Sequence, residues 1–352
     1  MTANPAELSC PAPRVETERV LLGHGSGGQL SAALVREVIV PALGAAAPAG
    51  PLEDAAVLDV DGVDLVMSTD SFVVSPLFFP GGDIGRLAVH GTINDVAVMG
   101  GEPIALSLAF VIEEGFPLED LRRVATSVGE AARAAGVSVV TGDSKVVGRG
   151  AADGLFVTTT GIGRRLPRAR FSAAAAAAGD VVLLSGPIGA HGVTVLSARE
   201  GLGFDGDVSS DTQPLHRLVR AMVDAGGSAV HAVRDPTRGG LASALNEIAA
   251  AAGVGVIIDE PAVPVPAPVS AACELLGLDP LHVANEGCLV AFVAPQAADA
   301  VLAAMRSVPE GFGATLIGRA VLDHPGRVTA RTLVGAQRIV DMLIGEQLPR
   351  IC

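Results

Sequence analysis

Short apolar runs alternate with amphipathic segments along the whole chain, a pattern that predicts both strands and helices. In the first half, runs rich in β-branched residues predict strands at 53–58, 65–71, 104–111, 137–140 and 155–162. Helical periodicity there predicts helices at 29–40, 84–99 and 118–135. The second half repeats this texture, with strands predicted at 180–185, 229–233, 254–258 and 289–293 and helices at 191–199, 215–225 and 241–252. The mixture predicts an α+β protein.

The chain has 352 residues, which is too long for one ordinary core and predicts two domains of similar size. A basic, proline-containing segment at 164–170 is the predicted boundary between them. We therefore expect a leader with a glycine-rich loop and helix at 1–43, an N-terminal domain at 44–165, a C-terminal domain at 166–340 and a mobile tail at 341–352.

Composition narrows the class of protein. The chain has 24 Lys and Arg against 38 Asp and Glu, a net charge of -14, and no Trp or Tyr, which argues against binding to nucleic acid or an anionic membrane. The N-terminus lacks the basic start and apolar core of a signal peptide, and no stretch holds 18 apolar residues free of charge and glycine. We expect a cytoplasmic protein without a membrane span.

The four cysteines are Cys10, Cys273, Cys288 and Cys352, and they form no CxxC pair and have no His at zinc spacing. A disulfide framework or structural zinc site is therefore not expected, and Cys288, next to an apolar strand, is interpreted as a small buried residue. Cys352 differs because it ends the chain. Eight residues from Gly345 onward, at about 3.3 Å each, would let its thiol reach on the order of 25 Å. The tail alone leaves two interpretations open, a movable arm with a working thiol or a frayed end with an incidental cysteine.

Two glycine-rich loops lead into predicted helices. Residues 23–28, GHGSGG, precede the helix at 29–40, and residues 234–240, RDPTRGG, precede the helix at 241–252. Backbone amides at such positions can converge on a phosphate, with a favourable helix dipole behind them. Neither loop matches an established nucleotide-binding pattern, so a loop that only caps its own helix stays an alternative. His24 is either a ligand donor or a solvated loop histidine.

Four aspartates, Asp54, Asp70, Asp95 and Asp235, lie at the ends of predicted elements or inside an apolar helix. Asp95, beside Asn94 in the helix at 84–99, costs several kcal/mol to bury unless it is paired or holds a cation. Sets of oxygen ligands favour hard divalent cations, and Mg²⁺ shares its shell with substrate phosphates. The pattern predicts an enzyme that uses ATP and Mg²⁺. Four ordinary capping or turn aspartates are the alternative.

Two further polar sites stand beside predicted strands. The strand at 137–140 leads into Gly142, Asp143 and Lys145, at the kind of position where working side chains are common. Glu286 lies in a predicted turn just before the strand at 289–293. It is either a working acid or base or a solvated turn carboxylate.

Seven segments carry a resemblance to a known family. They are HGSGGQLS at 24–31, EDAAVL at 53–58, STDSFVVSPLFFPGGDIGRLAVHGTINDVAVMGGEP at 68–103, GDSKVV at 142–147, RDPTRGGLA at 234–242, NEGCL at 285–289 and PRIC at 349–352. Together, in this order and over the full length, they resemble the HypE family of hydrogenase maturation proteins. The wider group that the chain resembles is the ATP-binding superfamily of aminoimidazole ribonucleotide synthetase, selenophosphate synthetase and thiamine-monophosphate kinase.

This resemblance implies a two-domain α+β fold, with an N-terminal domain that forms a homodimer through its β-sheets and a C-terminal α/β sandwich. ATP would lie in a cleft near the dimer interface. In the family, a HypF carbamoyltransferase loads the terminal cysteine, and HypE uses ATP to dehydrate the thiocarboxamide to a protein thiocyanate. The cyanide then passes to iron on the HypC/HypD complex for the active site of [NiFe]-hydrogenase.

The motif matches also imply roles for individual residues. Cys352 would carry the substrate, Glu286 would be the base, and Lys145 would place a positive charge near the transferred group. Mg²⁺ would be held by Asp54, Asp70, Asp95 and Asp235. The remaining ATP-binding residues would be His24, Gly25, Gly27, Gly28, Asn94, Gly142, Asp143 and Arg238.

Two rival functions stay open. A selenophosphate synthetase would need a reactive Cys or selenocysteine in the glycine-rich N-terminal segment, where this chain has Ser26. A non-catalytic carrier or scaffold would use the acidic surface and the tail only to hand a group between partners.

Overall fold

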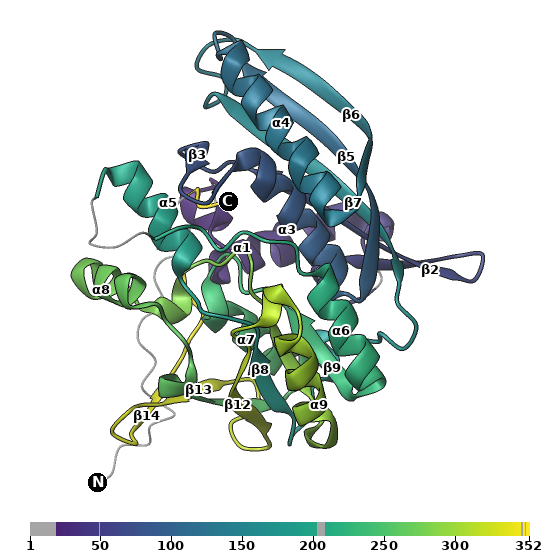
Figure 1. The fold of residues 1–352 in the computed structure, drawn as a ribbon, viewed down its shortest axis with the longest axis vertical. Coiled ribbons are helices and arrows are strands. Elements are labelled where there is room, and N and C mark those ends of the chain that lie inside the picture. Colours follow the sequence, from purple (N-terminus) through teal and green to yellow (C-terminus); the bar gives the residue numbers. More distant parts are fainter. Residues whose placement is uncertain (1–18, 49, 203–207, 346–347, 349) are drawn as a thin grey trace.

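The computed structural model describes residues 19–48, 50–202, 208–345, 348 and 350–352. Two large sheets, each covered by helices, form the two halves of the molecule (Figure 1). The C-terminus lies between them, beside the short strand β3 (Phe78–Phe79) and helix α5 (Ala190–Glu200) (Figure 1). The α+β class predicted from the sequence is confirmed.

The N-terminal sheet has five strands in the order β1-β2-β7-β5-β6. In chain order these are β1 Ala56–Val60, β2 Val63–Phe72, β5 Gly101–Glu113, β6 Ser138–Val147 and β7 Leu155–Arg165. Asp61 and Gly62 turn the β1-β2 hairpin with φ values of 52° and 81°, which is the geometry that tight hairpins need. Only β5 and β6 pair in parallel, because helix α4 (Leu118–Ala135) crosses between them.

Helices α3 (Ile84–Val98) and α4 pack on one face of this sheet (Figure 1). The Asp83 carboxylate caps α3 by accepting bonds from the backbone of Gly85 and Arg86, at 2.7 and 3.0 Å. Strand β7 alternates between buried residues, which face the helices, and more exposed ones. The other face of the sheet therefore stays open within one chain.

The C-terminal sheet has seven strands in the order β14-β13-β10-β12-β8-β11-β9. In chain order these are β8 Val181–Leu184, β9 Val230–Arg234, β10 Gly255–Asp259, β11 Val290–Val293, β12 Thr315–Val321, β13 Val328–Arg331 and β14 Gln337–Ile339. Each face of this sheet packs against helices in an apolar cluster of its own. One contains helix α7 (Gly240–Ala252) and the other contains α6 (His216–Gly226) and α9 (Pro295–Arg306), as in an α/β sandwich.

The predicted helix at 29–40 extends further than expected, as α1 (Gln29–Ala33), a π-helical stretch over Leu34–Ile39 and α2 (Val40–Leu43). Sequence periodicity assigned no element after residue 293, where the structure has α9 and three strands. It also missed α8 (Ala267–Leu276), which begins inside the proline-rich stretch. Pro268 stands at the start of that helix, where its missing N–H costs no hydrogen bond.

One helical stretch of the described chain, Gln29–Ala46, is long and apolar enough to cross a membrane, with a mean hydropathy of 1.3. It lies near the N-terminus, contains Arg36 and Glu37, and is not buried in the protein. A single helix of this kind is weak grounds for a membrane span.

Candidate active site between the two halves

The four predicted aspartates come from separate elements but act on one another electrostatically. Asp54 precedes β1, Asp70 is in β2, Asp95 is in α3, and Asp235 directly follows β9. Burial is the main cause that raises each carboxyl pKa, and repulsion from neighbouring acids adds to it for Asp54, Asp95 and Asp235. The pKa rises to about 6 for Asp54 and about 8 for Asp235, and well above its usual range for Asp95.

Hydroxyl groups donate to two of these carboxylates. Thr92 Oγ1 donates to Asp70 Oδ2 at 2.9 Å and lies 2.5 Å from Thr159 Oγ1, which in turn donates to the carbonyl oxygen of Ala88 at 3.0 Å. Ser68 Oγ donates to Asp95 Oδ2 at 2.7 Å. Both bonds stabilise the charged carboxylate and so oppose the rise in pKa that burial causes.

One buried arginine offsets part of this charge. Arg234 Nη2 pairs with Asp54 Oδ1 at 2.9 Å and with Glu247 Oε2 of α7 at 3.0 Å. Burial opposes the guanidinium charge, but the carboxylates outweigh it and raise the pKa of Arg234. The sequence analysis placed Arg234 only in a loop and did not single out Glu247. Glu247 is a polar residue in an otherwise apolar helix, the same signal that singled out Asp95.

Glu286 is 4% exposed, so the structure rejects the alternative of a solvated turn carboxylate. Its backbone N–H donates to Asp211 Oδ1 at 3.2 Å, and that of Gly287 donates to Asp211 Oδ2 at 3.0 Å. Burial, followed by the charges of Asp235 and Asp211, raises the Glu286 pKa well above its ordinary value. Asp211 supports this turn and was not identified from the sequence.

The Cys352 side chain belongs to the same electrostatic group. Burial raises the pKa of its thiol to about 12; Arg238 opposes this rise, and Glu286, Asp70 and Asp235 add to it. The thiol is therefore neutral at ordinary pH. The end of the chain is docked here, with Ile351 3% exposed in an apolar cluster, and the mobility of the tail stays a prediction. The docking arises because Ile351 buries apolar surface that an extended arm would leave in water.

The first glycine-rich loop packs directly on the second. Arg238 Nη1 donates to the carbonyl oxygen of Gly25 at 3.1 Å. Gly27 has a φ of 77°, and a Cβ there would lie 2.5 Å from the Arg238 Cβ, so both its conformation and its surroundings require glycine. A Cβ at Gly28 would clash with the carbonyl oxygen of Leu343 at the start of the tail. The loop is thus held between Arg238 and the tail.

Some loop groups already have local partners. The Gly27 N–H donates to Ser31 Oγ at 2.8 Å, and His24 Nδ1 accepts a bond from the backbone of Leu21 at 3.0 Å. His24 bonds within its own turn, and no contact links it to the carboxylates among the residues described. Its contact with ATP stays a prediction.

The strand β6 residues lie apart from this group in a single chain. Lys145 and Asp143 are exposed and pair with each other, Nζ to Oδ2 at 2.7 Å. Gly142 allows close pairing with β5, because a Cβ there would clash with the carbonyl oxygen of Leu108. In the described part of one chain, no contact joins these residues to the aspartates, and their roles at the ATP site stay predictions. The reason is that β6 is the edge strand of its sheet.

Asn94 braces the two halves against each other. Its Nδ2 donates to the carbonyl oxygen of Gln213 at 3.0 Å, and its Oδ1 accepts from the backbone of Leu215 at 2.8 Å. Both ends of the amide are thus used between α3 and the segment before α6. These contacts give Asn94 a structural role, and its contact with the nucleotide stays a prediction.

No group of three or more His, Cys, Asp or Glu side chains in the described part of the chain is arranged to hold a metal ion. The four aspartates influence one another without forming a closed cage of carboxylates. Any cation here would need ligands from outside the protein.

Comparison with known proteins gives the class first. Residues 52–165 match the N-terminal domain of AIR synthase related proteins, and residues 177–331 match the C-terminal domain of the same family. The two matches cover the two sheets. The chain is therefore an AIR synthase related protein.

Full-length relatives narrow this class. The carbamoyl dehydratase HypE of Rhizobium leguminosarum bv. viciae is 54% identical over 339 residues, 96% of each chain. A solved HypE–HypF complex superposes with a TM-score of 0.83 at 45% identity, covering 88% of this chain and 100% of the other. A HypE structure in complex with ATP gives 0.80 at 47% identity, covering 95% and 100%. The chain belongs to the HypE family of carbamoyl dehydratases, which are enzymes of hydrogenase maturation, as the motifs predicted.

Proposed function

We propose that this protein uses ATP to dehydrate an S-carbamoyl group on Cys352 to a thiocyanate, which supplies cyanide for the iron of [NiFe]-hydrogenase. The observation that carries the proposal is the docked tail, whose thiol is influenced electrostatically by Arg238, Glu286, Asp70 and Asp235. The family membership supports the reaction class. A terminal cysteine held in a buried acidic site is otherwise hard to explain, because its thiol is too weakly acidic to be a good nucleophile.

The chemistry requires an oxygen to leave from an amide carbon. Phosphoryl transfer from ATP to the carbamoyl oxygen turns that oxygen into a phosphate leaving group, while the C–O bond breaks and the nitrogen gives up both of its protons. The products are a thiocyanate, ADP and phosphate. Phosphoryl transfer mainly needs charge neutralisation and alignment, and proton removal needs a nearby base.

Glu286 is the proposed base. Burial and the charges of Asp235 and Asp211 raise its proton affinity. The charge of Glu286 in turn raises the pKa of the Cys352 thiol. A base with a higher pKa accepts the proton of a weakly acidic N–H more readily. Glu286 acts in this way once the neighbouring carboxylates are neutralised, because Glu286 is then ionised. Arg238 is the cation of this chain that acts on the thiol, so it takes the place that we first expected for Lys145. Lys145 would reach such a site only from another copy of the chain.

ATP and Mg²⁺ are the proposed cofactors. Asp54, Asp70, Asp95 and Asp235 fit a hard divalent cation, because they present buried oxygen donors whose negative charge Arg234 offsets only in part. When bound, such a cation neutralises a triphosphate. The amides near Gly25 to Gly28 and the Arg238 side chain would then contact the phosphates. The solved relative in complex with ATP supports this assignment.

The proposed partners are a HypF carbamoyltransferase, which loads the thiol, and the HypC/HypD complex, which accepts the cyanide. A relative solved as a HypE–HypF complex supports the first of these. We also propose a homodimer formed through the open face of the N-terminal sheet, and a cytoplasmic location. Neither a nucleic acid nor a membrane is among the proposed partners.

Intact-mass spectrometry tests the reaction. Protein carbamoylated by HypF is separated from it and given Mg-ATP, and we expect a loss of one water from the protein mass. Cys352→Ala should acquire no carbamoyl group and lose no water, while still binding ATP. Cys10→Ala, a change outside the described residues, is the matched control and should behave like the wild type.

The rival functions give other results. If carbamoylated protein keeps its mass and consumes no ATP, the chain is a carrier or scaffold. If ATP is consumed only with selenide, it is a selenophosphate synthetase.

A further inference from the structure

The docked end of the chain is held mainly through its backbone. Val73 N–H donates to the carbonyl oxygen of Cys352 at 3.0 Å, and Ser75 N–H donates to that of Arg350 at 3.3 Å. The Arg350 side chain returns a bond, from Nε to the carbonyl oxygen of Val73 at 3.0 Å, and also pairs with Asp153. The tail thus pairs with residues 73–75 much as an added strand would.

His191, in the first turn of α5, bonds the middle of this segment. Its Nε2 lies 2.8 Å from the carbonyl oxygen of Ile351, and its Nδ1 lies 2.8 Å from Ser210 Oγ. Burial lowers the pKa of His191 to about 4, so the ring is neutral. A carbonyl oxygen can only accept, so the ring proton is on Nε2, and Nδ1 accepts from Ser210. Phe79 packs edge-on against the ring, with centroids 5.5 Å apart, and fixes its plane.

Arg199, at the other end of α5, joins both paired segments. Its Nη2 donates to the carbonyl oxygen of Arg350 at 2.7 Å, and its Nε donates to that of Ser75 at 2.8 Å. His191 and Arg199 therefore contact the backbone of the tail, at Ile351 and Arg350. These contacts set the path of the tail backbone, and with it the position of the terminal thiol.

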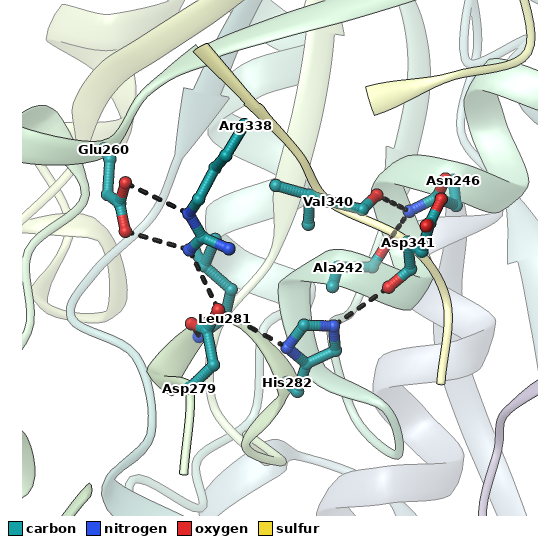
Figure 2. Close-up of polar contacts among 9 residues, drawn as sticks. All are labelled: Ala242, Asn246, Glu260, Asp279, Leu281, His282, Arg338, Val340 and Asp341. Atoms are coloured by element: carbon teal, nitrogen blue, oxygen red, sulfur yellow. Dashed lines mark hydrogen bonds and ion pairs between the residues drawn. The ribbon is translucent and has the colours of Figure 1, made fainter. Parts of the chain in front are cut away.

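The start of the tail is held separately (Figure 2). Arg338 pairs with Glu260 and Asp279, at 2.9 and 2.8 Å, and Asn246 Nδ2 donates to the carbonyl oxygen of Val340 at 2.8 Å. His282 Nε2 lies 2.9 Å from the carbonyl oxygen of Asp341 (Figure 2). Beyond this, the backbone of Leu30 donates to the carbonyl oxygen of Ile344 at 3.1 Å. The tail has an anchored start and a separately bonded end.

We propose that His191 and Arg199 are positioning residues that form a clamp on the backbone of residues 350–352. The clamp holds the thiol beside Glu286 and Arg238 and opens so that the thiol can be loaded outside the site. The catalytic role of the clamp rests on the proposed function, whereas the existence of the clamp does not.

Alkylation of the unloaded protein tests the clamp without any assumption about the reaction. Iodoacetamide should modify Cys352 faster when the tail is open, since the docked side chain is partly buried and its thiol is neutral. Loss of one such hydrogen bond changes an open-to-closed ratio by about five- to tenfold, so Arg199→Met and His191→Phe should each speed the alkylation of Cys352 by about that factor. His191→Gln keeps a donor and should lie nearer the wild type. Arg319→Met, an exposed arginine of β12, is the matched control and should match the wild type.

The second measurement is the ATP-dependent loss of water from the carbamoylated protein. We expect Arg199→Met to slow it by about five- to tenfold while leaving the KM for ATP unchanged, because Arg199 acts on the position of the tail and is not among the proposed ATP ligands. An unchanged alkylation rate in both Arg199→Met and His191→Phe would refute the clamp. Faster alkylation with an unchanged rate of water loss would refute its positioning role. If the wild type itself loses no water, the proposed function fails, and the alkylation rates still decide whether the clamp exists.

Discussion

At the scale of single residues, burial decides what the carboxyl groups can do. Glu286 and Glu114 have the same side chain, but Glu286 is buried among other acids and Glu114 is exposed. Burial and the neighbouring acids raise the pKa of Glu286 well above its usual value. The local sequence could mark Glu286 as a candidate, because NEGCL is a family motif. It could not show that Asp211, 75 residues away in the sequence, holds its backbone.

Glu286→Gln should leave loading intact and block the loss of water. Removal of a general base typically costs 10²- to 10⁴-fold, so we expect the carbamoylated form to accumulate and its rate of dehydration to fall by about 100-fold or more. Intact-mass time courses after ATP addition measure this. The matched control is Glu114→Gln, which should keep the wild-type rate. A normal rate in Glu286→Gln would remove this residue from the role of base.

Asp235 makes stability depend on pH. Its pKa is about 8 in the folded protein against an ordinary value of 3.8, so the folded state binds the proton more tightly. Its contribution to the free energy of unfolding is therefore fully present below about pH 4 and is lost as pH rises through about 8. Without nucleotide, Tm should fall between pH 5.5 and 8, and Asp235→Asn should flatten this fall.

Differential scanning fluorimetry measures both effects. Asp299→Asn, at an exposed position of α9, is the control and should keep the wild-type slope. Mg-ATP should raise Tm more at pH 8 than at pH 5.5, because a cation competes with protons for the same carboxylates. A pH slope identical in wild type and Asp235→Asn would contradict the proton assignment.

At the scale of elements, the site forms where the ends of helices and strands meet. The glycine-rich loop before α1 reaches the loop before α7, and Gly27 is the point of closest approach to Arg238. Periodicity predicted α1, α3, α4 and α7 because each shows a repeating pattern of apolar residues. It could not predict that the two loops touch, since that contact joins residues more than 200 positions apart.

Gly27→Ala should weaken ATP binding, while Gly129→Ala should not. Alanine at a φ of 77° costs about 1 kcal/mol, and its Cβ would also push against the Arg238 Cβ. We expect a Kd for a non-hydrolysable ATP analogue about tenfold higher or more, measured by calorimetry. A Cβ added at Gly129 of α4 would meet no atom within 4 Å, and the φ of Gly129 is not left-handed, which makes this glycine the matched control. Equal affinities in the two variants would separate the loop from nucleotide binding.

At the scale of the whole molecule, the open face of the N-terminal sheet is the largest unexplained surface feature. Strand β6 is the edge strand, and its Val140 and Val146 side chains are 66% and 71% exposed. Apolar side chains on an exposed edge strand favour pairing with another chain. Lys145 lies on the same strand, so a dimer would also explain why a family motif stands so far from the carboxylates of its own chain.

Val140→Asp should convert a dimer to a monomer. A charge placed in an apolar interface must be desolvated, which costs several kcal/mol and outweighs the contacts that remain. Size-exclusion chromatography with light scattering measures the mass, and we expect the wild type to have twice the mass of the variant. Leu322→Asp, at a side chain 84% exposed after β12, is the control and should stay dimeric. A monomeric wild type would refute the dimer.

The sequence by itself determined the α+β class, most of the helices and strands up to residue 293, the family, and the residue types of the site, because these depend on local periodicity and short motifs. Only the tertiary structure decided which of those residues act together. Burial and repulsion among distant side chains raise the pKa values of Asp235 and Glu286, and contacts across 160 residues join His191 to the tail. Lys145, by contrast, lies apart from the group in one chain, although its motif is as clear as the others. Motifs reveal which chemical groups are present, whereas desolvation and charge depend on neighbours that the fold alone supplies.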